Sequence, residues 1–222
     1  MASRPKSARK PNYSVHPEVA AASEWIEDLP RRTGRSLEEW LALIEQSGPK
    51  RHDERADWLR RMHGLNPSAA ARLAERAEGK GFEKSDPQAY LEAAPGAVDA
   101  MYSGAKEALR PLHDRLIRLA QRLGPDVRIC PWEGAVPLFR QHLFARIKAA
   151  TRSRIDLALA VGDQKAGGRL LAREQAEPEE RITHRILIRD PGDIDLELER
   201  WLRKAYELDG PDAFDAPAAP AT

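Results

Sequence analysis

The chain has 222 residues, of which 41% are hydrophobic and 32% charged, which is enough for one large domain or two small ones. Its 36 Lys and Arg residues against 35 Asp and Glu residues give a formal net charge of +1, which excludes a uniformly basic nucleic-acid coat and a uniformly acidic mimic of nucleic acid. The one cysteine, Cys130, excludes a disulfide framework within the chain and a multi-cysteine zinc site.

The hydropathy of the sequence predicts no membrane-spanning segment. No stretch approaches the ~20 apolar residues that a membrane-spanning helix needs. The charged start, MASRPKSARK, is not followed by the apolar run of a secretory signal. We therefore expect a cytoplasmic protein with no membrane partner, and the sequence leaves its oligomeric state open.

Charge is distributed unevenly along the chain. Residues 1–17 hold four basic and no acidic side chains, residues 126–176 hold nine basic and five acidic, and residues 177–222 hold six basic and twelve acidic. This asymmetry points to charged partners more than the net charge does. The segments 1–15 and 209–222 contain too few apolar residues to offset their ordering entropy, so we expect a disordered basic tail and a disordered acidic tail.

Residues 16–78 show helical periodicity with clear boundaries. Pro17 suits the first turn of a helix that we expect to stop near Pro30. Ser36 and Glu39 form a capping box, and Gly64 suits a helix C-terminus. The pattern predicts an all-helical bundle over 16–78, followed by a linker over 79–97.

The turn Gly64–Leu65–Asn66 between two of these helices has the outline of a DNA-reading helix-turn-helix. Only Ser68, Arg72 and Arg76 of the following helix suit contacts with bases or phosphates. An ordinary antiparallel helix pair is the favoured interpretation.

Residues 98–208 predict an α+β domain. Leucines at helical spacing indicate a long helix over 98–123, which Pro111 kinks or restarts. Strand signals follow at 126–130, 135–140, 142–149, 153–161 and 182–189, and a last helix spans 193–208. Because these strands are adjacent in sequence, we expect a mostly antiparallel sheet of about five strands, with the two long helices packed on one face.

Alternation along the strands sorts the charges onto the other face. The exposed face is predicted to carry one carboxylate, Asp156, and a set of cations: Arg140, Arg146, Lys148, Arg152, Arg154, Arg185 and Arg189. Phe144 is expected on the same face as a stacking platform for bases. The alternative is an ordinary solvated sheet face.

The leading hypothesis is a protein without catalytic activity that binds the backbone of DNA or RNA with little sequence preference. The basic face and the N-terminal cations Arg4, Lys6, Arg9 and Lys10 would make the phosphate contacts. The alternative is a protein–protein adaptor whose acidic C-terminal helix and tail engage a basic partner.

A second alternative is an enzyme with its site near Cys130, His142 and His184. Cys130 would act as nucleophile, a histidine as base and Asp156 as its orienting group. A buried structural cysteine and a core His184 are the simpler interpretations. The chain has no metal-binding spacing, P-loop or dinucleotide fingerprint, so we expect no cofactor.

Two stretches resemble known domains. The motif TGRSLEEW at 33–40, with His52, Trp58 and HGL at 63–65, resembles a helical domain of unknown function in bacterial proteins. The segments at 98–112, TRSRIDL at 151–157, THR at 183–185 and WLRKAY at 201–206 resemble a second domain of unknown function. That domain also occurs at the end of predicted transport proteins and beside nuclease-type domains. The second setting implies nucleic acid as a partner, and the resemblance implies no catalytic residues.

Overall fold

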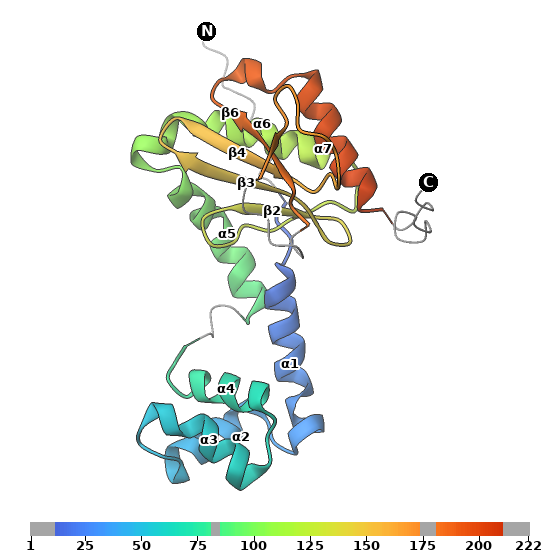
Figure 1. Cartoon of the computed structure of the whole chain (residues 1–222). Coiled ribbons are helices and arrows are strands. Elements are labelled where there is room, and N and C mark those ends of the chain that lie inside the picture. The colour runs from blue at the N-terminus through green and yellow to red at the C-terminus, as the bar shows by residue number, and fades with distance from the viewer. Residues whose placement is uncertain (1–11, 81–84, 174–180, 211–222) are drawn as a thin grey trace, which may run out of the picture. The chain divides into compact units, whose positions relative to one another are not determined.

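The computed structural model describes residues 12–80, 85–173 and 181–210. The chain divides into two compact units (Figure 1). Val15–Ala93 form the first unit, and the second consists of the chain from Ala94 onward together with the segment up to Ser14. The predictions for Arg4, Lys6, Arg9 and Lys10, and most of the disordered tails predicted at 1–15 and 209–222, lie outside the described residues. The inner ends of both tails are ordered, contrary to the prediction: Ser14 N donates to the carbonyl of Ile129 at 2.9 Å, and the Asp209 side chain is buried.

The first unit contains α1 (Pro17–Thr33), α2 (Leu37–Ser47), α3 (His52–His63), α4 (Pro67–Arg76) and the start of a fifth helix. The capping box is confirmed, because Glu39 N donates to Ser36 Oγ at 3.2 Å and Ser36 N donates to Glu39 Oε2 at 2.7 Å. The expected stop near Pro30 is wrong: α1 continues to Thr33, where Gly34 with φ of 78° ends it. Trp40, Leu59 and Leu73 lie in the core of this unit.

Helix α5 (Pro87–Met101) covers the second half of the segment expected to be a linker. The long helix expected over 98–123 is interrupted. A 3₁₀ turn, η1 (Gly104–Leu109), follows α5, and α6 (Arg110–Gln121) then begins with Pro111 in its first turn. Proline is tolerated there because the first helical N–H groups have no intrahelical partner. The restart predicted at Pro111 is therefore confirmed.

The second unit contains a six-stranded antiparallel sheet in the order β1-β2-β3-β4-β6-β5. Its strands are β1 (Arg128–Ile129), β2 (Val136–Phe139), β3 (Leu143–Thr151), β4 (Arg154–Leu159), β5 (Leu171–Ala172) and β6 (His184–Ile188). Five were expected, and β5 is the addition. Two residues are too few to show an alternating pattern.

Helices α6 and α7 (Leu196–Leu208) pack on the same face of this sheet, as expected (Figure 1). One apolar core joins their inner sides to the strand residues Ile147, Leu157 and Ile186. Helix α7 begins three residues later than predicted because Asp195, not Asp193, caps it by accepting from Leu198 N at 2.9 Å. The fold is thus α+β, with one covered sheet face and one face away from α6 and α7, here called the open face.

Candidate functional site

The strand register places the predicted cations side by side on the open face. Arg146 on β3 pairs with Ala158 on β4, and Ala158 pairs with Arg185 on β6. In the next row, Lys148 pairs with Asp156. Directly paired residues point to the same face of a sheet, so the alternation predicted for Arg146, Lys148, Arg154 and Arg185 holds in the structure.

A small apolar cluster lies between these charges. Ala158, Ala160 and Ile182 are buried, and Leu143 packs against them. No residue of a helix belongs to this cluster, in contrast to the core on the other face.

Asp156 organises the charges at the centre of the open face. Arg154 Nε donates to Asp156 Oδ1 at 2.7 Å, and Arg185 Nη1 lies 3.6 Å from Asp156 Oδ2. The cross-strand neighbour Lys148 is exposed, and no ion pair joins it to another described residue. Among the described strand residues, four cations thus share this face with one carboxylate, Asp156, which holds two of the guanidinium groups in place.

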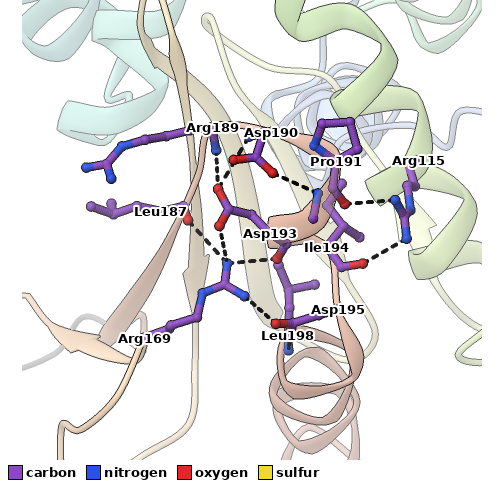
Figure 2. A network of polar contacts seen from close by, with 11 residues as sticks. Arg115, Arg169, Leu187, Arg189, Asp190, Pro191, Asp193, Ile194, Asp195 and Leu198 are labelled. Carbon is purple, nitrogen blue, oxygen red and sulfur yellow. Dashed lines mark hydrogen bonds and ion pairs between the residues drawn. The ribbon is translucent and has the colours of Figure 1, made fainter.

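Arg152 and Arg189 extend this charge at one end of the sheet. Arg152 lies exposed in the turn between β3 and β4, and Arg189 directly follows β6. The backbone N–H of Arg189 donates to Asp193 Oδ2 at 2.7 Å, while its guanidinium points away from that turn (Figure 2). Both side chains are exposed and can contact a ligand at this end of the sheet.

A different arginine fixes the connection between β6 and α7. Arg169 donates to Asp195 Oδ2 at 2.8 Å and to the carbonyl of Asp193 at 2.7 Å (Figure 2). Arg115 on α6 donates to the carbonyls of Pro191 and Ile194. These two arginines satisfy carbonyl groups of the turn, so their role is structural.

Arg140 does not join the open basic face in the way predicted. Its Nε donates to Asp126 Oδ2 at 2.6 Å, its Nη1 donates to the carbonyl of Tyr206 at 3.2 Å, and its guanidinium lies 4.2 Å from the centre of the Tyr206 ring. The Arg140 side chain is 19% exposed. It ties the end of β2 to α7, so its charge is already engaged within the domain.

The prediction that Phe144 faces outward is wrong. Leu138 pairs with Ala145 and Phe139 pairs with Leu143, which leaves Phe144 as the extra residue of a β-bulge. The bulge interrupts the alternation, so Phe144 joins Ala145 on the covered face. Phe144 is fully buried, and its ring packs edge-on against Tyr206 with the centroids 5.8 Å apart.

Sequence reasoning missed Arg128 and Phe139 on the open face. The two residues pair across β1 and β2, and the Arg128 guanidinium lies 5.8 Å from the Phe139 ring centre. The signal was present in the sequence, because Val136 and Leu138 alternate with Pro137 and Phe139. Phe139 is partly exposed and takes the place on this face that Phe144 was expected to fill.

The residues of the hypothetical enzyme site lie in environments that do not suit the roles considered. Burial raises the pKa of the Cys130 thiol to about 12, which disfavours the nucleophilic thiolate. His184 lies on the covered face, with its Nδ1 2.9 Å from Thr183 Oγ1. His142 is oriented by Asp209, not Asp156: Asp209 Oδ1 lies 3.0 Å from His142 Nδ1.

Asp209 is the buried centre of this last contact. It also accepts from His142 N and from Arg181 Nη2, each at 2.8 Å, and its side chain is 1% exposed. The network joins the start of β3 and the segment before β6 to the end of α7. Among the described residues, no group of three or more His, Cys, Asp or Glu side chains could hold a metal ion.

The helix-turn-helix interpretation of α3 and α4 loses two of its three contact residues. Arg76 is buried and donates to Ser85 Oγ at 2.8 Å, and Arg72 lies over the Trp25 ring with 5.3 Å to its centre. Only Ser68 remains exposed without such an engagement. The geometry therefore favours the ordinary helix pair.

The fold and these contacts define a two-domain α+β protein whose sheet carries a basic open face. Residues 98–209 match the family described as Domain of unknown function (DUF5655), and residues 22–78 match the one described as Domain of unknown function (DUF4287). The first match covers half of the chain, so the protein belongs to that family. The expected tandem of two such domains is confirmed.

No curated protein and no solved structure matches the chain. None of the helices described combines the length and the apolar character needed to cross a membrane.

Proposed function

We propose that this protein binds the sugar-phosphate backbone of nucleic acid on the open face of its sheet. The observation that carries the proposal is the register that sets Arg146, Lys148, Arg154 and Arg185 on one face. Asp156 is the one carboxylate that the described strand pairs place among them. Clustered cations attract phosphates and release the counterions condensed on them.

The chemistry of the face favours backbone contacts over base recognition. Its cations lie on rigid strands, and Asp156 fixes the two guanidinium groups of Arg154 and Arg185. Phe139 is the one aromatic residue that the described strand pairs place on this face, at its β1–β2 end. With a single partly exposed ring, stacking adds little, so we expect similar affinity for different sequences.

The test is the binding of the full chain to fluorescently labelled single-stranded and duplex oligonucleotides, measured by anisotropy across a salt series. Phosphate contacts predict a steep, linear fall of log affinity with log salt between about 50 and about 200 mM. Lys148→Gln and Arg152→Gln should each weaken binding and reduce this slope by about one.

The matched control is Arg118→Gln, which removes one exposed positive charge from α6 on the helix side of the domain. It should leave both affinity and slope nearly unchanged. If Arg118→Gln weakens binding as much as Lys148→Gln, the attraction comes from the total charge and the open face is not the site. Absence of binding at about 50 mM salt removes the proposal altogether.

A further inference from the structure

A groove lies on the helix side of the second unit, between the end of α6 and the first half of α7. Its volume is about 410 Å³, which is within the range of about 300–1,000 Å³ that pockets for small molecules occupy. Four leucines give it an apolar lining: Leu119, Leu123, Leu196 and Leu202. Leu119 and Leu202 are buried, whereas Leu196 is 76% exposed. A ligand in this α6–α7 groove would therefore cover apolar surface.

The two helices beside the groove run in the same direction. Arg115 on α6 donates to the carbonyl of Ile194, just before α7, at 2.8 Å. Further along both helices, the Tyr206 hydroxyl on α7 donates to Asp126 Oδ1, shortly after α6, at 2.6 Å. Lining residues that are similarly spaced from these two contacts are therefore level with one another across the groove.

The positive charge of the groove is concentrated at one end. Arg122 and Arg203 both lie between the two contacts and nearer to the second, whereas Leu196 begins α7 at the other end. Arg200 lines the groove about one turn before Arg203. None of the three arginines forms an ion pair with another described residue. Glu199, the one carboxylate among the described lining residues, lies between the two ends.

A ligand with one alkyl chain and one anionic head matches this polarity. An amphipathic helix of a partner protein does not, because its apolar and charged residues lie on opposite sides along its whole length. From Leu196 to Arg203, α7 rises about 10 Å at about 1.5 Å per residue. C–C bonds of about 1.5 Å advance an extended alkyl chain by about 1.25 Å per carbon, so about eight carbons cover this distance.

We propose that the α6–α7 groove binds a free medium-chain fatty acid, with the alkyl chain on the leucines and the carboxylate between Arg122 and Arg203. A guanidinium group binds a carboxylate through two parallel charge-assisted hydrogen bonds. Glu199 repels the carboxylate from the middle of the groove and so favours this orientation. Burial of the alkyl chain adds up to about fourfold in affinity per CH2 group.

The proposal is tested by leucine methyl NMR of the full chain during a titration with sodium octanoate, up to about 5 mM to include weak binding. Octanoate should shift the methyl resonances of Leu123 and Leu196. Butyrate, which lacks four CH2 groups, should bind on the order of a hundredfold more weakly, and octanol, which lacks the charge, about tenfold more weakly. Leu196→Gln and Arg203→Gln should each weaken octanoate binding about tenfold, and Glu199→Gln should strengthen it.

The matched controls are Leu208→Gln, which changes an exposed leucine at the far end of α7, and Lys148→Gln, which removes a cation from the open face. Both should leave the affinity for octanoate unchanged. If octanoate does not shift the Leu196 resonances, the groove is not a fatty-acid site. If octanol binds as tightly as octanoate, or if Lys148→Gln weakens binding as much as Arg203→Gln, the arginine end does not hold the carboxylate and the proposal is wrong.

These results are independent of nucleic-acid binding, because the α6–α7 groove and the open face share none of the residues named for them. Octanoate should therefore leave the affinity for an oligonucleotide unchanged. Displacement of octanoate by an oligonucleotide would show that phosphates occupy the groove, and would overturn its assignment to a fatty acid.

Discussion

Arg154 Nε and Asp156 Oδ1 are joined by a 2.7 Å hydrogen bond between residues two positions apart on β4. Both side chains lie on the open face, where Asp156 also attracts Arg185. The carboxylate therefore stabilises the cation cluster while it cancels part of its charge. Substitution of Asp156 should therefore change stability and nucleic-acid affinity in opposite directions.

Asp156→Asn should strengthen nucleic-acid binding and weaken the fold slightly. Removing the carboxylate frees about one additional cation for a phosphate, which corresponds to a gain of up to about tenfold in affinity near 0.1 M salt. The free energy of unfolding should fall by about 0.5 kcal/mol, as for partly exposed ion pairs. Anisotropy titrations and urea unfolding measure the two effects.

Glu207→Gln is the control for Asp156→Asn, because it removes an exposed carboxylate from α7. The overall change in charge is the same, but its location is on the helix side. Equal gains in affinity for the two variants would contradict a binding site on the open face.

Substitution of Phe144 should lower the stability of the fold without changing the affinity for nucleic acid. Its buried ring fills the space next to Tyr206 in the core beneath α7. Phe144→Ala should lower the free energy of unfolding by about 3–5 kcal/mol, and the milder Phe144→Leu by about 1 kcal/mol. Under conditions in which the variants are folded, their affinity for an oligonucleotide should equal that of the unmodified chain.

The measurement combines denaturant unfolding with anisotropy on the folded fraction. A Phe144→Leu variant that is stable but binds oligonucleotide more weakly would indicate that Phe144 is part of the binding surface. That result would contradict the bulge that turns the residue inward.

The case of Phe144 shows where sequence reasoning stopped. The alternation of β3, β4 and β6 correctly predicted that Arg146, Lys148, Arg154 and Arg185 share a face, because side chains in regular strands alternate strictly. A bulge breaks this rule by one residue, and nothing in the local sequence around Phe144 marks it. Because of this one extra residue, the Phe144 ring lies on the covered face and not on the open face as predicted.

The Asp209 network could not be predicted for a different reason. His142 and Asp209 are separated by 67 positions, and only the packing of α7 against β3 brings them together. A single sequence contains no signal for such a pair, and the sequence-based hypothesis names Asp156 as the orienting group instead. Local patterns predict faces and caps, whereas long-range side-chain pairs depend on the assembled fold.

The burial of His113 predicts that the stability of the fold depends on pH. It is buried beside Tyr102, with 4.6 Å between the ring centroids, and burial lowers its pKa from 6.5 to about 4. The unfolded chain binds the proton near pH 6.5, and the folded chain binds it only near pH 4. Stability is therefore fully present above about pH 6.5 and falls as the pH drops towards 4, by up to about 3 kcal/mol from this group.

Amide hydrogen exchange in α6 between pH 4 and pH 7 measures this effect. His113→Phe should remove most of the fall in this window, because the unfolded chain then has no proton to gain at this position. His52→Gln, which changes an exposed histidine, should leave the dependence unchanged. A variant at His113 with the same pH profile as the unmodified chain would show that other groups cause the loss.

Cys130 provides the test of the enzyme alternative. Its side chain is buried, and the same burial raises its pKa to about 12, so the thiolate fraction at neutral pH is far below that of an ordinary cysteine. The native protein should therefore react with a disulfide reagent at least about a hundredfold more slowly than a model peptide thiol. The lower thiolate fraction of Cys130 is sufficient to cause a difference of this size. The reaction should become fast in denaturant, which is the control that the thiol is intact. Rapid labelling of the folded chain would instead place a reactive nucleophile at Cys130 and would reopen the search for a catalytic site there.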